Sequence, residues 1–345
     1  MDLTVGFRPS EVVFADDGNG AYVVTEDGIS VLRFADITGP TVAPFVRFPD
    51  AGAAAPAALD VSVTPDGRYA IARREGLSQV MLLDLAAAAG ASPVTTVDLV
   101  SPVTDLDLAP GGAFALAVLR AENAYVRIAI PGGFAAGATR DKRVLAGEAI
   151  GSATLSADGA TAVLYTTAGT PPVERVVVVK LGAPATPPLP VPLKKSVRAV
   201  AIGSDGKTAI VLHDRIDGDS RQPGLDVEAQ IDRAYGYTIV NLATGFAKLQ
   251  LTPDEVTAQA LTPDGALAFV LVRGPRVVQR IALGSFIVDE FPLGSPPLAL
   301  AVLGEASKRV FVSQEHPEGR ISFINWETGV IESVTGFELN GRIVQ

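Results

Sequence analysis

Residues Asp60–Gly76 read DVSVTPDGRYAIARREG, and this stretch decides the fold. Two segments of alternating apolar and polar residues flank a Pro-Asp-Gly turn, which is the sequence form of a β-hairpin. The form recurs with a turn marker at Gly18, Gly67, Gly112, Gly159, Gly206, Gly265 and Ser307. The markers are spaced by 49, 45, 47, 47, 59 and 42 residues. A strand-rich period of about 40–50 residues is typical of the blades of a β-propeller.

Each copy supplies four strands. An inner strand such as Leu59–Val63 precedes the turn, a second strand follows it, and a third strand such as the β-branched run Val176–Val179 leads to an outer strand. The apolar residue four places after each marker should pack between blades. These residues are Tyr22, Ile71, Leu116, Val163, Ile210, Phe269 and Phe311. We therefore predict an all-β fold, a single seven-bladed β-propeller domain of four-stranded antiparallel blades over residues 1–345.

Both ends of the chain offer an outer strand to the last blade. Met1–Phe7 (MDLTVGF) and Val330–Phe337 (VIESVTGF) each have the pattern of such a strand. We expect the N-terminal strand to join the C-terminal blade and close the ring, and leave open which segment forms its outer strand. Asp84–Ala91 (DLAAAAGA) has helix-forming composition but lies where a loop is expected, so we interpret it as a turn or a helical loop.

The composition restricts the class of protein and of partner. The chain is 48% apolar and 19% charged, which supplies a large core. Its net charge of -10 opposes binding to nucleic acid or to an anionic membrane surface, because phosphates are neutralised by clustered Lys and Arg. No apolar run is long enough to predict a membrane span. The absence of Cys excludes disulfides, thiolate zinc sites and a catalytic thiol.

Two copies carry a family resemblance. RVFVSQ and GRISFINWETGVIESV, in the range 309–334, and AYVVTEDGISVLRF, at 21–34, resemble the bacterial YVTN-type propeller repeat. The resemblance covers nearly the whole chain and implies the propeller fold. Related propellers include surface-layer and surface proteins, periplasmic binding proteins and sugar-lactone hydrolases. The Thr-Asn pair of that repeat is mostly replaced here, for example by Thr25-Glu26 and Arg74-Glu75.

Candidate ligand contacts lie where the second strands end. In a propeller these loops share one face with the loops that enter the inner strands, and ligands usually bind there. The residues eight places after each marker are Glu26, Glu75, Arg120, Thr167, Asp214, Arg273 and Glu315, with Arg73, Arg74, His213, Arg215 and His316 beside them. The alternative interpretation is that these are solvated loop residues without a ligand.

The fifth copy contains an insertion, Asp214–Gly236. A long loop in a compact domain is commonly functional, so we expect a lid or a partner-binding loop. Within it, Leu225–Tyr235 is predicted to form a short amphipathic helix. Asp214, Asp217 and Asp219 are candidate ligands for calcium, although their spacing is not that of an EF-hand loop. A solvated acidic loop is the alternative, and no other cofactor is indicated.

The function stays open between three classes. We expect a non-catalytic binding or scaffold propeller that recognises a protein or small ligand through this face and the insertion. A lactonase-like hydrolase is the first alternative, in which His213 and His316 would act as base and orienting group. A structural subunit of a larger surface assembly is the second. From the resemblance we expect export to the periplasm or cell surface of a bacterium, with a signal or lipid anchor absent from this sequence. A cytoplasmic location is also compatible with the lack of Cys.

Overall fold

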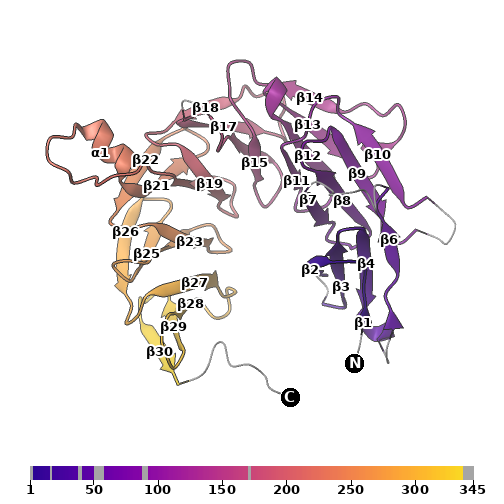
Figure 1. Ribbon diagram of the computed structural model, residues 1–345. Helices are drawn as coiled ribbons and strands as arrows, with labels where there is room; N and C mark the ends of the chain where they lie inside the picture. The colour runs from indigo at the N-terminus through magenta and orange to yellow at the C-terminus, as the bar shows by residue number, and fades with distance from the viewer. Residues whose placement is uncertain are drawn as a thin grey trace. The chain divides into compact units, whose positions relative to one another are not determined.

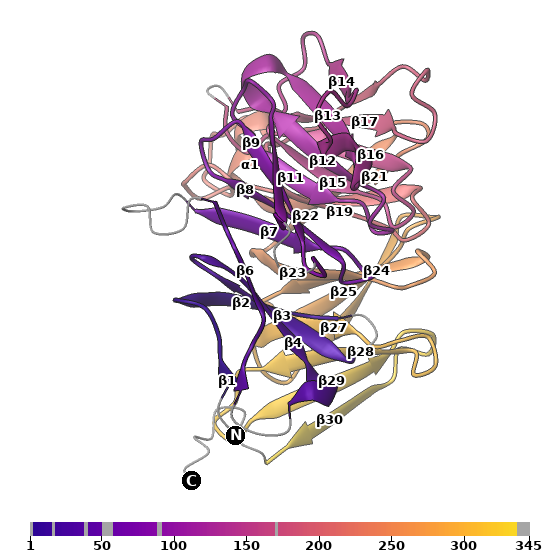
Figure 2. The ribbon, with the colours of Figure 1, turned by 90° about the vertical axis from the view of Figure 1, so that its right-hand side faces the viewer.

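The computed structural model describes residues 3–15, 18–37, 41–49, 58–87, 92–169 and 172–336. In this part of the chain the strands form seven four-stranded antiparallel sheets, as the repeat predicts (Figure 1). The strands of the third sheet can also be followed in Figure 2. The all-β propeller fold is thereby confirmed.

Each sheet is formed by strands of one sequence repeat. In hydrogen-bonded order the first three sheets are β2 (Pro9–Phe14), β3 (Gly20–Thr25), β4 (Gly28–Arg33) and β6 (Phe45–Arg47); β7 (Leu59–Val63), β8 (Tyr69–Arg74), β9 (Gln79–Asp84) and β10 (Val94–Asp98); and β11 (Asp105–Leu108), β12 (Phe114–Leu119), β13 (Ala124–Ala129) and β14 (Asp141–Val144). The fourth and fifth sheets are β15 (Ser152–Leu155), β16 (Thr161–Tyr165), β17 (Arg175–Lys180) and β18 (Leu189–Pro192); and β19 (Val197–Ile202), β20 (Thr208–His213), β21 (Tyr235–Asn241) and β22 (Ala247–Thr252). The sixth and seventh are β23 (Val256–Leu261), β24 (Leu267–Val272), β25 (Val277–Ala282) and β26 (Ile287–Pro292); and β27 (Pro297–Val302), β28 (Arg309–Gln314), β29 (Arg320–Asn325) and β30 (Ile331–Thr335).

Helical structure is confined to short segments. The described residues contain the α-helix α1 (Val227–Arg233) and the 3-10 helices η1 (Phe34–Asp36), η2 (Arg120–Glu122) and η3 (Gly132–Phe134). Among them there is no helix with the length and apolar character that crossing a membrane requires. The described start of the predicted Asp84–Ala91 loop is a turn, in which Asp84 accepts a hydrogen bond from the Ala86 amide at 3.0 Å. Residues 88–91 lie outside the described residues.

The chain divides into two compact units, Met1–Leu155 and Ser156–Gln345. Each unit buries apolar clusters between consecutive sheets, as in the packing of Ile29 with Leu83 in the first unit. In the second unit Phe269 packs in one cluster with Trp326, which is 5% exposed. Trp326 is therefore a packing residue.

The repeated turn is stabilised by its own side chains. In the second copy the Thr64 hydroxyl donates to the Asp66 carboxylate at 2.6 Å, and Asp66 accepts the Arg68 amide at 3.1 Å. These hydrogen bonds hold the pKa of Asp66 below its ordinary value. Gly67 has φ +65°, and a Cβ there would lie 1.7 Å from the Tyr22 hydroxyl of the first sheet. The glycine is thus required both by the turn and by packing between sheets.

The predicted packing positions on the second strands are mostly buried. The fully buried ones are Ile71, Leu116, Val163, Ile210 and Phe269. Tyr22 and Phe311 are only half-buried. Phe311 makes an edge contact with Phe323, with ring centroids 6.0 Å apart.

The predicted N-terminal strand is described as a short strand of the first unit. Leu3–Thr4 (β1) pairs in parallel with Thr41–Val42 (β5). The next residues also find partners nearby, since the Gly6 amide donates to the Ser30 hydroxyl at 3.0 Å and the Phe7 amide to Asp27 at 3.0 Å. The outer strand of the seventh sheet is β30, from the C-terminal candidate segment. Within the described residues, no N-terminal strand hydrogen-bonds to that sheet.

Candidate functional site

Arg74, predicted to contact a ligand in the first unit, instead connects neighbouring sheets. It is 3% exposed, and its guanidinium donates to the Glu26 carbonyl at 3.2 Å and lies 5.6 Å from the Phe48 ring centre. It therefore links the second sheet to the first. The Glu26 carboxylate pairs with Arg8 at 3.2 Å. The burial of Arg74 argues against a direct ligand contact.

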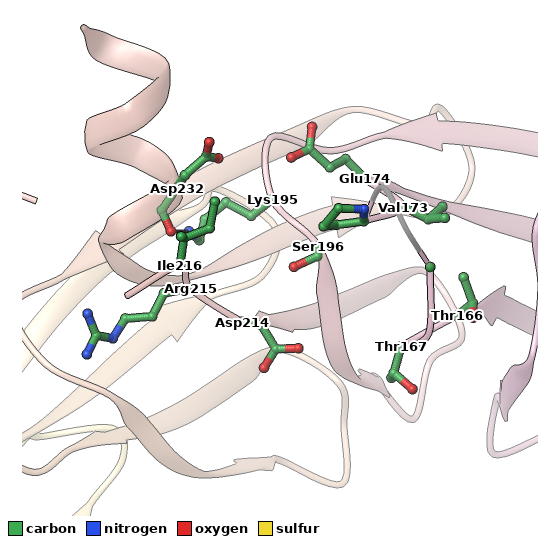
Figure 3. A pocket seen from close by; sticks show the side chains of 12 residues that line it. Thr166, Thr167, Val173, Glu174, Lys195, Ser196, Asp214, Arg215, Ile216 and Asp232 are labelled. Carbon is green, nitrogen blue, oxygen red and sulfur yellow. Dashed lines mark hydrogen bonds between the residues drawn. The ribbon is translucent and has the colours of Figure 1, made fainter. Parts of the chain in front are cut away.

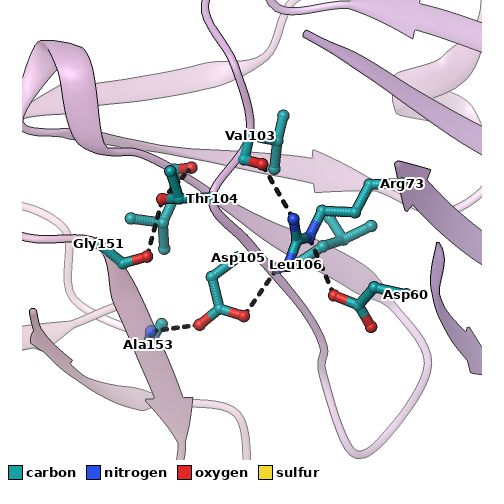
Figure 4. A network of polar contacts seen from close by, with 9 residues as sticks. Asp60, Arg73, Val103, Thr104, Asp105, Leu106, Gly151 and Ala153 are labelled. Carbon is teal, nitrogen blue, oxygen red and sulfur yellow. Dashed lines mark hydrogen bonds and ion pairs between the residues drawn. The ribbon is translucent and has the colours of Figure 1, made fainter. Parts of the chain in front are cut away.

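Arg73 connects the second sheet to the third (Figure 4). Its Nε donates to the Asp60 carboxylate at 3.0 Å, and its Nη1 donates to the Val103 carbonyl at 3.1 Å. The adjacent Glu75 is exposed, and its amide donates to the Ala58 carbonyl at 2.9 Å. Of Arg73, Arg74 and Glu75, only Glu75 presents its side chain to solvent, as we expected of the candidate ligand contacts.

Arg120 lies where η2 begins, directly after β12, and is half-buried. Its Nε is buried and has no hydrogen-bond acceptor. The guanidinium occupies the space that the missing side chain of Gly151 leaves, because a Cβ on that glycine would be 2.3 Å from Nε. A buried donor without a partner is rare and costs about 1–3 kcal/mol, so this side chain has capacity for a further acceptor.

Two carboxylates on the inner strand β11 were missed by the sequence reasoning. Asp105 accepts the Ala153 amide at 2.7 Å (Figure 4), whereas Asp107 has one carboxylate oxygen, Oδ2, that is buried without a partner. Burial, helped by the nearby charges of Asp105 and Asp60, raises the pKa of Asp107 to about 8. Burial also raises the pKa of Asp105. The signal in the sequence was the Asp-x-Asp pattern of an inner strand.

In the second unit, Arg273 and Glu315 pair with each other. Arg273 follows β24 and Glu315 follows β28, and their side chains form an ion pair at 2.6 Å. His316 accepts the Glu318 amide through Nδ1 at 3.2 Å, within its own turn. These three predicted site residues therefore lie at the ends of adjacent second strands, and two of them contact each other.

His213 is buried at the end of β20, with 4% of its surface exposed. Its Nδ1 donates to the Ser196 carbonyl at 2.9 Å, because a carbonyl can only accept, and its Nε2 accepts from the Thr238 hydroxyl at 2.6 Å. Burial lowers the pKa of His213 to about 4. With both ring nitrogens engaged, His213 is held as a neutral packing residue, which argues against the predicted ligand contact and against a role as general base.

The insertion is attached to the fifth sheet by Lys195, which is 2% exposed. Its ammonium donates to the Ile231 carbonyl at 2.7 Å and to the Asp232 carbonyl at 2.8 Å. These carbonyls belong to the last turn of α1, where a cation also complements the helix dipole. Burial lowers the pKa of Lys195, while the charges of Asp232, Glu174 and Asp214 act in the opposite direction.

The helix predicted at Leu225–Tyr235 forms over the shorter range Val227–Arg233. Asp226 caps it by accepting the Ala229 amide at 2.7 Å. Arg215 donates to the Gly218 carbonyl at 3.1 Å and lies 4.5 Å from the Tyr235 ring centre. Arg215, at the start of the insertion, thus contacts both Gly218 within it and Tyr235 near its end.

A cavity of about 510 Å³ lies beside this insertion (Figure 3). It is formed by the loop after β16, the loop that enters β19, the end of β20 and the end of α1, which include Thr166, Thr167, Glu174, Ser196, Asp214 and Asp232. Figure 3 shows the Arg215 side chain directed away from that of Asp214. The structure therefore brings together Thr167, Asp214 and Arg215 from the candidate ligand contacts. It adds Lys195, Glu174 and Asp232, which we did not predict to lie in a site.

The acidic residues of the insertion include the calcium candidates Asp214, Asp217 and Asp219. Among the described residues there is no group of three or more His, Asp or Glu side chains that could hold a metal ion. Asp214 lines the cavity, and Asp219 accepts the Arg221 amide at 2.8 Å within a local turn. Asp214, Asp217 and Asp219 therefore do not gather around one point.

Comparison with known proteins supports the fold alone. No protein-family model matches the chain, and no curated protein matches its sequence. Among solved structures, 96% of the chain aligns with 67% of the dihydro-heme d1 dehydrogenase NirN in complex with DHE, at a TM-score of 0.63 and 12% identity. It also aligns over 96% of its length with 97% of Hsv2 from Kluyvelomyces marxianus, at a TM-score of 0.52 and 11% identity, and over 95% with 95% of Kuenenia stuttgartiensis hydrazine synthase, at a TM-score of 0.50 and 15% identity. At these identities the likeness is one of architecture.

Proposed function

We propose that this propeller is a non-catalytic binding protein that holds a small polar ligand in the cavity beside the insertion. The observation that carries the proposal is the cavity itself, whose volume of about 510 Å³ falls in the range of small-molecule sites. It lies on the loops that a propeller most often uses for binding. A folded insertion forms part of its wall.

The charges of the cavity favour a ligand with hydroxyl and amine groups. Glu174, Asp214 and Asp232 contribute carboxylates, and Thr167 and Ser196 contribute hydroxyls. Two cations, Lys195 and Arg215, line the same cavity, and they keep their charge although Lys195 donates to helix carbonyls and Arg215 lies on Tyr235. With three carboxylates against two cations the lining is negative by one charge, and an amino sugar fits it better than a neutral or acidic sugar.

The test is thermal denaturation of the full chain with glucosamine, glucose and glucuronate at equal concentration and ionic strength. A ligand that binds only the folded state raises Tm. We expect glucosamine to raise Tm most and glucuronate least. Asp214→Asn should abolish the preference for glucosamine over glucose.

The matched control is Glu305→Gln, which removes an exposed carboxylate from the turn before β28. It should leave the preference unchanged. The proposal is contradicted if none of the three sugars raises Tm, or if glucuronate raises it as much as glucosamine does.

We also propose that the protein is exported or surface-associated in a bacterium. The support is the YVTN-like repeat, which occurs in proteins of that kind. Fractionation of the native host with an antibody to this chain tests it, and we expect the protein in the periplasmic or cell-surface fraction. Recovery in the cytoplasmic fraction alone would contradict the proposal.

A further inference from the structure

The first unit contains a second cavity, of about 460 Å³, at the ends of β8 and β12. Its polar lining consists of Asp60, Arg73, Glu75, Thr104 and Arg120. All of its lining residues belong to the first unit, so the cavity is independent of the one beside the insertion.

Most donors in this cavity already have acceptors. Arg73 uses Nε on Asp60 and Nη1 on the Val103 carbonyl. The Thr104 hydroxyl donates to the Gly151 carbonyl at 2.7 Å. These groups fix the walls of the cavity.

Arg120 is the exception. Its Nε is buried without an acceptor, and its guanidinium makes no hydrogen bond or ion pair with any described residue. An Arg side chain is permanently charged and presents a planar fork of donors that matches a carboxylate. Gly151 leaves the space in which this fork lies, because any Cβ there would be 2.3 Å from Nε.

The same position in another repeat shows what the fork can hold. Arg273 stands eight residues after its turn glycine, as Arg120 does, and its Nη2 is 2.6 Å from the Glu315 carboxylate of the following repeat. In the repeat after Arg120, the residue at the Glu315 position is Thr167, which has no carboxylate. The chain thus provides a carboxylate for one arginine of this pair and not for the other.

We infer that Arg120 binds the carboxylate of a small, singly charged ligand in this cavity. The fork forms two parallel charge-assisted hydrogen bonds with a carboxylate. A phosphate dianion is disfavoured, because the Glu75 carboxylate lines the same cavity and would repel its second charge. Asp60 and Arg73 form an ion pair, so together they add no net charge to the cavity.

The experiment follows the arginine Nε–Hε signals of the full chain by NMR while sodium acetate is added, with sodium chloride at equal ionic strength as the blank. Arg120→Lys and Arg273→Lys assign the two signals. We expect acetate to shift the Arg120 signal to saturation and to leave the Arg273 signal in place, because Glu315 already occupies that fork. Inorganic phosphate should bind Arg120 more weakly than acetate.

Gly151→Ala tests the geometry without removing the arginine. The new methyl group meets only the flexible end of Arg120 among its nearest neighbours, so the fold should tolerate it. We expect it to weaken acetate binding about tenfold by displacing the fork. Arg273→Gln is the matched control and should leave acetate binding unchanged.

Three results would overturn the inference: an Arg120 signal that acetate does not move, a signal that moves no more than that of Arg273, or unchanged acetate binding in the Gly151→Ala variant. Tighter binding of phosphate than of acetate would overturn the assignment to a single charge. This cavity shares no lining residue with the cavity beside the insertion, in which we propose that the amino sugar binds. Either proposal can therefore fail while the other holds.

Discussion

Asp107 in the first unit and His213 in the second are both buried titratable groups, but only His213 has a hydrogen-bond partner for each of its polar atoms. Both ring nitrogens of His213 have partners, Ser196 and Thr238, and burial holds the ring neutral with a pKa of about 4. Asp107 has an unpartnered oxygen and two acidic neighbours, and its pKa is raised to about 8. The first arrangement stabilises the fold at neutral pH, whereas the second destabilises it when the group ionises.

The two groups should therefore give opposite pH dependences. The pKa of Asp107 is raised in the folded state from 3.8 to about 8. The contribution of Asp107 to the folding stability is therefore fully present below about pH 4 and is lost as the pH rises to about 8. The pKa of His213 is lowered from 6.5 to about 4. The contribution of His213 to the folding stability is therefore fully present above about pH 6.5 and is lost as the pH falls towards 4. Between these limits the two effects oppose each other.

The largest expected effect comes from Asp107→Asn, which removes the ionisation. At pH 8 the variant should be more stable than the wild type by on the order of 5 kcal/mol, and at pH 4 the two should be equal. Urea denaturation from pH 4 to pH 8 measures the difference. A constant difference across this range would show that Asp107 ionises freely in the folded protein.

His213→Gln tests the other side of the comparison. The variant cannot reproduce both ring hydrogen bonds, so it should lose about 2 kcal/mol at pH 7. The loss should shrink as the pH falls from 6.5 to 4, because only the wild type is then destabilised by the cost of charging the ring. His316→Gln is the control, since His316 makes one local contact, and should change stability by less than about 0.5 kcal/mol.

Lys195→Met should give a smaller and more local effect. It leaves the Ile231 and Asp232 carbonyls without their donor and removes a cation from the end of α1. The amides of α1 should exchange with solvent about tenfold faster, equivalent to about 1.4 kcal/mol of local opening. Lys194→Met is the control, because Lys194 is exposed and lies 3.9 Å from Glu228. Equal exchange in both variants would mean that Lys195 does not hold the helix.

The fold could be predicted because its signal is local. The hydroxyl, Asp and Gly of the repeated turn bond with one another within five residues, as Thr64 shows with Asp66 and Tyr69. Their spacing therefore reports the architecture without any knowledge of distant contacts. The pairing of β1 with β5 was not predicted, because pattern alone does not select the partner of a strand.

The site could be predicted only in part. Loop position identified Thr167 and Asp214, which do line the cavity. It did not predict the burial of Arg74 and His213, because burial depends on which neighbouring sheet covers them, and alternation within a strand does not report that. Lys195 was visible only as half of a basic pair, Lys194-Lys195, and its partners are 36 and 37 residues away in the sequence.

The contact between Lys195 and α1 makes the hydrogen bonds of a buried lysine depend on the presence of the insertion. A chain that lost residues 216–234 would keep a lysine whose acceptors had gone, at the edge of a packed sheet. Insertion and lysine should therefore be gained or lost together in evolution. A shortened fifth repeat made in the laboratory should carry Lys195→Met as a companion change.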